Sequence, residues 1–360
     1  MTIARNLIVP PGIEGLYHCI VRCVRRAFLC GKDDHSGRDY EHRKSWVKDR
    51  LQYLSGIYCV DVAGYAVMSN HLHIVVRTRP DQVLGFSDEE AAERWLKLFP
   101  KRRDEDGNPM MPEKREIAAL VAGKKRMLKI RERLSSLSWF MRCVNEFVAR
   151  KANREDDCKG RFWEGRFKSQ ALLDEAAVLA CMAYVDLNPI RAKIAQTPET
   201  SDYTSVQDRI HGREAREAGK RAGASGRGEN NGSVPHATYR DEWLTPIGYS
   251  EQKDTKSKRG VLPLKLEEYL ELVEWSGRML REDKRGKIPA HLAPIMQRLQ
   301  IDRGNWLNTV EQYGGWFCYA AGRVDSIVKA AGEYGRKWLK GIGSSQVAFT
   351  QKKEVKTQAG

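Results

Sequence analysis

Two β-prone stretches joined by a tight turn occupy residues 58–78, with the sequence YCVDVAGYAVMSNHLHIVVRT. Residues 58–68 are apolar enough for a buried strand, Ser69-Asn70 is typical of a tight turn, and residues 71–78 form another strand-like run. The segment therefore predicts a β-hairpin.

The elements on either side extend this hairpin into a βαββαβ order. Residues 15–24 predict a first strand, and residues 40–54 place apolar side chains at helical spacing. After the hairpin, residues 135–152 predict a second core helix and residues 162–173 a fourth strand. A further helix is expected to begin at Asp174, a residue type that caps helices well. The fold class is therefore α+β.

Composition divides the rest of the chain. Residues 1–210 are expected to form the sheet domain, with a charged, largely helical insertion at about 80–134. Residues 211–260 are polar and rich in Gly, Ala and Arg, which predicts a flexible linker. A helical pattern over 261–345 predicts a small accessory module, and 346–360 a disordered tail.

The charge balance favours a polyanionic partner. The 360 residues contain 62 Lys and Arg against 47 Asp and Glu, a net charge of +15. No apolar run reaches the roughly 18 residues of a membrane span, and no signal segment is evident. Eight cysteines without paired spacing indicate reduced thiols. We therefore expect a cytoplasmic, nucleoid-associated protein with no membrane partner.

The triplet His71-Leu72-His73 places two imidazoles on one face of a strand. Such a pair supplies half of a divalent metal site. A bare His-x-His fits two exposed or hydrogen-bonded histidines as well. The triplet alone leaves both interpretations open.

Tyr184 and Asn188 share the rim of the apolar stripe on the helix that follows Asp174. A tyrosine there can hold its ring in apolar surroundings and present its hydroxyl to a cleft, or serve as a half-buried packing residue. Asn188-Pro189 also fits the start of a new helix.

Three ordered blocks together carry a family resemblance. They are GYAVMSNHLH at residues 64–73, GRFWEGRF at 160–167 and YVDLNPIRA at 184–192. Over residues 15–203 the chain resembles the single-tyrosine His-hydrophobic-His (HUH) transposases, and among them the REP-associated tyrosine transposases. The insertion that follows residue 78 and everything beyond about 211 depart from the family pattern.

The resemblance implies a ferredoxin-like nuclease domain that cuts and rejoins one DNA strand during transposition or recombination. Tyr184 matches the nucleophile, which would form a 5′-phosphotyrosine intermediate. His71 and His73 match paired metal ligands, with Asn188 as a third, and Mg²⁺ or Mn²⁺ suits such a shell. The implied partner is single-stranded or hairpin DNA. The sequence leaves open the hairpin recognised, the physiological metal and whether the chain forms a homodimer.

Cations and aromatic rings alternate in the second block, a mixture suited to phosphates and unstacked bases. The residues taken as nucleic-acid contacts are Arg161, Trp163, Arg166, Lys168 and, in the third block, Arg191. The aromatic residues of this block can equally belong to the core.

Two alternatives remain. A non-catalytic nucleic-acid-binding protein could keep this fold, whereas a zinc hydrolase fits poorly because the chain lacks an HExxH motif. The basic run Lys284-Arg285-Gly286-Lys287 suggests that the accessory module adds DNA affinity without supplying catalytic groups. A purely structural or protein-binding cap is the alternative that the sequence leaves open.

Overall fold

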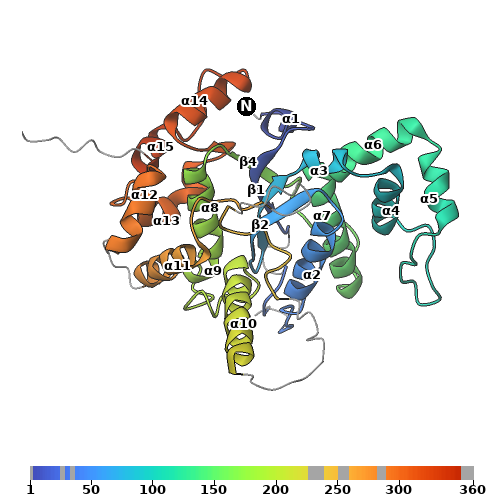
Figure 1. Ribbon diagram of the computed structural model, residues 1–360, viewed down its shortest axis with the longest axis horizontal. Helices are drawn as coiled ribbons and strands as arrows, with labels where there is room; N and C mark the ends of the chain where they lie inside the picture. The colour runs from blue at the N-terminus through green and yellow to red at the C-terminus, as the bar shows by residue number, and fades with distance from the viewer. Residues whose placement is uncertain are drawn as a thin grey trace, which may run out of the picture.

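The computed structural model describes residues 3–24, 29–32, 37–225, 239–249, 259–281 and 289–349. It shows an α+β architecture in which one sheet carries helices on both faces (Figure 1). No helix in these ranges is long and apolar enough to cross a bilayer. The expected tail from residue 350 onward and the Lys284-Arg285-Gly286-Lys287 run lie outside the described residues.

The strands are β1 (Gly15–Arg22), β2 (Val60–Val67), β3 (His71–Thr78), β4 (Lys168–Leu172) and β5 (Ala320–Ala321). Their order is β2-β3-β1-β4-β5, and the pairs among the first four strands are antiparallel. This is the order of a ferredoxin-like βαββαβ unit, which confirms the predicted fold class. β5 pairs parallel to β4 and comes from the C-terminal region.

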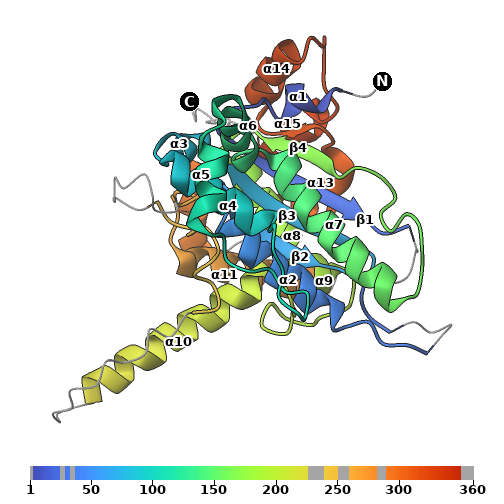
Figure 2. The ribbon, with the colours of Figure 1, turned by 90° about the vertical axis from the view of Figure 1, so that its right-hand side faces the viewer.

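Two helices cover one face of the sheet, and their burial explains why they form there. They are α2 (Arg43–Ser55) and α7 (Leu137–Glu155), which pack against each other (Figure 2). Phe140 and Val144 of α7 are fully buried. Each such side chain contributes about 1.5–3 kcal/mol relative to an exposed position.

The opposite face is covered by α8 (Glu175–Asp186), which the short α9 (Asn188–Arg191) follows. As predicted, Asp174 caps α8: its side chain accepts a hydrogen bond from the Ala177 amide at 3.0 Å. Nearly all of α8 is buried, because the sheet lies on one side and C-terminal helices on the other.

The insertion is helical, as its sequence predicted. Its helices are α3 (Pro80–Leu84), α4 (Asp88–Leu98), α5 (Lys114–Val121) and α6 (Lys124–Leu134). They extend to one side of the sheet, whereas the short α1 (Arg5–Ile8) lies near the end of β4 (Figure 1).

The segment expected to be a flexible linker differs from the prediction. α10 (Ser205–Ser225) runs through its first part and projects from the body (Figure 2). Residues 239–249 then pack beside β2, where the Thr245 amide donates to the Val62 carbonyl at 2.8 Å. Ala, Arg and Glu are strong helix formers, so the first part of this segment is helical although it lacks an apolar stripe.

The C-terminal region is mostly helical, as expected, but it does not stand apart from the sheet domain. Its helices are α11 (Leu266–Arg281), the 3₁₀ turn η1 (Ala290–Leu292), α12 (Ala293–Arg298), α13 (Trp306–Trp316), α14 (Val324–Glu333) and α15 (Ile342–Phe349). Tyr269 donates a hydrogen bond to buried Asp186 at 2.5 Å, and α13 packs on α8. α15 also continues into the segment expected to be a tail.

Candidate active site

The sheet register gathers the site on the face that α8 covers. Arg22 lies opposite His71, and Ile20 lies opposite both His73 and Lys168. Directly paired residues project from the same face of a sheet. The histidine pair and two cations from three strands therefore lie together.

A third histidine, His18 of β1, completes this cluster. Nε2 of His18 lies 2.8 Å from Nδ1 of His73, and the two rings stack with centroids 5.1 Å apart. Nδ1 of His71 lies 2.6 Å from the side-chain oxygen of Asn70. Nε2 of His73 is buried and has no hydrogen-bond partner among the described residues.

Burial keeps these imidazoles neutral. It lowers the pKa of His18 to about 4 and, with the Arg22 charge, that of His71 to about 4. It also holds the pKa of His73 well below its usual range, with the neighbouring histidines adding to the effect. A neutral imidazole has the lone pair that a metal ion requires.

Tyr184, near the end of α8, faces the histidines. Its ring centroid lies 5.5 Å from that of His73 and 6.0 Å from that of His18. The Arg191 guanidinium lies 4.8 Å from the centre of the tyrosine ring. Burial raises the pKa of Tyr184, while Arg191 opposes that rise by its charge and a hydrogen bond.

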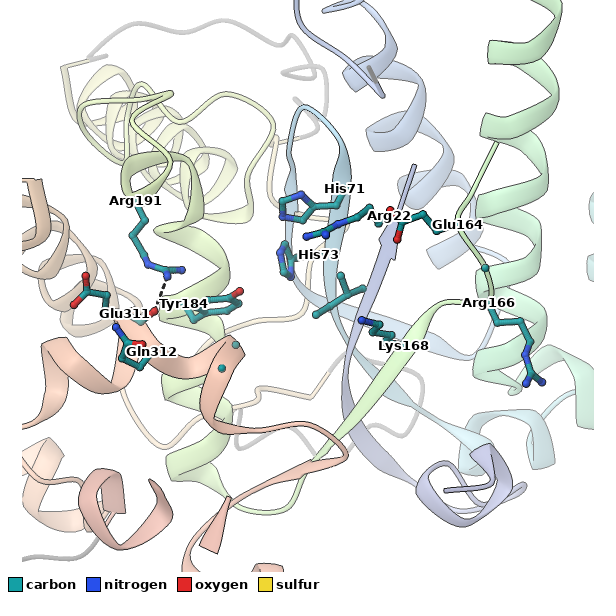
Figure 3. A pocket seen from close by; sticks show the side chains of 14 residues that line it. Arg22, His71, His73, Glu164, Arg166, Lys168, Tyr184, Arg191, Glu311 and Gln312 are labelled. Atoms are coloured by element: carbon teal, nitrogen blue, oxygen red, sulfur yellow. Dashed lines mark hydrogen bonds between the residues drawn. The ribbon is translucent and has the colours of Figure 1, made fainter. Parts of the chain in front are cut away.

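These groups open into a cavity of about 560 Å³. It is lined by Ile20, Arg22, His71, His73, Glu164, Gly165, Arg166, Lys168, Tyr184, Arg191, Glu311, Gln312, Gly314 and Gly315. In Figure 3, Arg22 and Lys168 lie beside the histidine pair and Arg166 farther out. None of the ion pairs in the described part of the chain involves these three cations.

The predicted nucleic-acid contacts divide into two groups. Arg166, Lys168 and Arg191 line the cavity, but Arg161 and Trp163 do not. Trp163 is buried, and its indole N–H donates to the Asn145 carbonyl at 2.8 Å. Its ring therefore has no free face for a base and belongs to the core, the alternative that the sequence left open.

Two other tyrosines lie outside the cavity. Tyr65 is fully buried opposite Ile74, and its hydroxyl donates to Asp208 at 2.7 Å. Tyr203 follows α9 in an irregular segment with a φ of 59°. Tyr184 is thus the tyrosine whose hydroxyl faces the histidine pair (Figure 3).

The donor set fits a divalent cation in part. The described residues contain no group of three or more His, Cys, Asp and Glu side chains arranged to hold a metal. They do offer the unpartnered Nε2 of His73 beside His71. Asn188 is buried, its amide nitrogen has no partner in the described residues, and it does not line the cavity. A metal bound here would need water or phosphate oxygens to complete its shell.

Sequence reasoning missed His18 and the contribution of α13. Once β1 is paired with β3, His18 falls on the same face as Arg22, but the sequence does not give that register. Glu311, Gln312 and Gly314 come from a region whose packing against α8 no local pattern indicates.

Comparisons with known proteins leave the family unassigned. No family model matches this chain, and no curated protein matches it. A search of solved structures found the REP-associated tyrosine transposase bound to a REP hairpin, with 10% sequence identity and a TM-score of 0.33. The match covers 56% of this chain and 80% of that one. Similarity this low shows neither a shared family nor a shared function.

Proposed function

We propose that this protein is a transposase-like DNA strand transferase that nicks and rejoins single-stranded or hairpin DNA through a covalent bond to Tyr184. The supporting observation is the position of the phenol, 5.5 Å from the His73 ring between ring centroids, in a cavity that Arg22 and Lys168 also line. A positioned nucleophile and cations beside the phosphate are the main requirements of phosphoryl transfer.

The proposed reaction is a transesterification. The Tyr184 oxygen forms a bond to the scissile phosphorus, and the bond from phosphorus to the 3′ oxygen breaks. The phenolic proton passes to solvent and the departing 3′ oxygen takes up a proton. The products are a 5′-phosphotyrosine and a free 3′-hydroxyl. A second 3′-hydroxyl can reverse the step and rejoin the strand without ATP.

Tyr184 needs electrostatic help, because a phenol has a pKa near 10 and burial raises that of Tyr184 further. Arg191 works against that rise, and Arg22 and Lys168 can neutralise the phosphate. Mg²⁺ or Mn²⁺ held by His71 and His73, with Asn188 as a third ligand, would supply Lewis-acid polarisation of the phosphate.

A second candidate is a nucleic-acid-binding protein of the same fold without catalysis. The raised pKa of Tyr184 favours it, as does the lack of a third His, Cys, Asp or Glu ligand beside the histidine pair among the residues that the structure describes. Both candidates predict binding of single strands in the cationic cavity, so binding alone does not separate them.

Product analysis separates the two functions. A strand labelled at its 5′ end and incubated with the protein and Mg²⁺ should yield a shorter fragment that ends in a 3′-hydroxyl. The downstream fragment should stay attached to protein, and EDTA should stop both. An intact strand under these conditions would contradict the proposed strand-transfer activity and favour the non-catalytic binding protein.

A further inference from the structure

We propose that α13 completes the strand-transfer site and that Gly314 is a positioning residue for Tyr184. The inference deepens the proposed function and rests on it. It concerns a helix that lies outside the βαββαβ unit, more than a hundred residues after Tyr184 in the chain.

Two residues of α13 contact Tyr184 or the Arg191 side chain that lies over its ring. The Glu311 carbonyl accepts a hydrogen bond from the Arg191 guanidinium at 2.5 Å, which holds Arg191 over the Tyr184 ring (Figure 3). The Tyr313 ring packs on the Tyr184 ring, with centroids 5.2 Å apart and planes inclined by 32°. These contacts fix one side of the phenol.

Gly314 lies directly against the Tyr184 hydroxyl. A Cβ atom at this position would lie 2.7 Å from the Tyr184 hydroxyl oxygen and 3.3 Å from Cζ. Real Cβ contacts essentially never fall below 3.0 Å, so a side chain here would force the phenol and α13 to shift relative to each other. Glycine is also a poor helix former, and its place within α13 therefore calls for a packing reason.

The absence of a side chain at Gly314 determines where the Tyr184 hydroxyl can lie. α13 presents bare backbone to the phenolic oxygen, so Tyr184 can lie against the helix with its oxygen directed into the cavity. A methyl group at residue 314 would turn the ring and move the oxygen from its line to the phosphate. Displacements of about 1 Å can cost about 100-fold in rate when attack must be in line. In this proposal α13 does not supply the reacting group, but it sets the position of the Tyr184 oxygen.

The test compares Gly314→Ala with Gly332→Ala in the full chain. Gly332 is a helical glycine of α14 with open space where its Cβ would stand, so both substitutions bring the same gain in helix propensity. Single-turnover formation of the protein–DNA adduct should slow by about 100-fold in Gly314→Ala and stay unchanged in Gly332→Ala. Affinity for the uncut strand should be the same in both.

A thermal-unfolding cycle supplies a readout that does not depend on cleavage. Gly314→Ala should lower Tm in the wild-type background and lower it much less in Tyr184→Phe, where the obstructing oxygen is gone. If wild type forms the adduct and Gly314→Ala forms it equally fast, only this inference is overturned. If wild type forms no adduct, the proposed function fails and the inference fails with it.

Discussion

His18 and His73 share a buried hydrogen bond, with Nε2 of His18 2.8 Å from Nδ1 of His73. For Nε2 of His73 to keep its lone pair, Nδ1 must carry the proton and donate it to His18. Gln170 lies opposite His18 in the pairing of β1 with β4, and its side-chain oxygen accepts a hydrogen bond from Tyr313 of α13 at 2.9 Å. α13 thus contacts the strand residue that pairs with His18, the partner of the histidine that faces Tyr184.

The first prediction concerns His18. Replacing it with Phe keeps a ring in the core but removes the acceptor that orients His73, so Mn²⁺ affinity should fall by about 10- to 100-fold. Isothermal titration calorimetry measures the change. His291→Ala, which alters an exposed histidine paired with Glu271, is the control and should bind Mn²⁺ like wild type. Unchanged Mn²⁺ affinity in His18→Phe would contradict the proposal that His18 orients His73.

The second prediction concerns the metal ligands themselves. The double variant His71→Ala/His73→Ala should lose Mn²⁺ binding altogether, because it removes both imidazoles from the cavity. Asn188→Ala should weaken binding without abolishing it. If calorimetry shows wild-type Mn²⁺ affinity in the double variant, the metal does not bind at His71 and His73.

Single-strand binding should depend on the cavity cations. Arg166→Ala/Lys168→Ala removes up to two phosphate contacts, so the slope of log K against log salt should fall by about 1.4. Fluorescence anisotropy of a labelled oligonucleotide between about 50 and 200 mM salt gives this slope. The control Lys124→Ala/Lys125→Ala alters two exposed cations of α6 and should leave the salt slope nearly unchanged. Equal slopes in the two double variants would argue against binding in the cavity.

The junction between α8 and α11 should be important for stability. Asp186 is buried and accepts hydrogen bonds from Ser205, Val206 and Tyr269. Tyr269→Phe leaves one carboxylate oxygen without this donor and should lower the free energy of unfolding by about 1–3 kcal/mol. Urea denaturation measures it. A loss well under 1 kcal/mol would mean that water replaces the hydroxyl.

The sequence predicted what local patterns determine. Two apolar runs around the Ser69-Asn70 turn predicted the hairpin of β2 and β3, helical spacing predicted α2 and α7, and Asp174 indicated the start of α8. Short spacings also placed His71 and His73 on one face. These features depend on neighbours within a few residues.

Long-range pairing was beyond such patterns. The contact of His18 with His73 follows from the β1–β3 register, and that of Gly314 with Tyr184 from packing between helices far apart in the chain. Trp163 was predicted to contact nucleic acid but is buried, because an aromatic residue among cations can pack in the core as well as stack on a nucleobase. Only its burial and its hydrogen bond to Asn145 separate the two roles.

The most direct test of the central claim is the fate of Tyr184 in the presence of single-stranded DNA and Mg²⁺. Wild type should form an adduct that survives boiling in detergent, and peptide mapping should place the phosphodiester on Tyr184. Tyr184→Phe keeps the ring in its packing position, so it should fold and bind the strand normally but form no adduct. An adduct in Tyr184→Phe, or a linkage mapped to Tyr65, Tyr203 or any other tyrosine, would contradict the account.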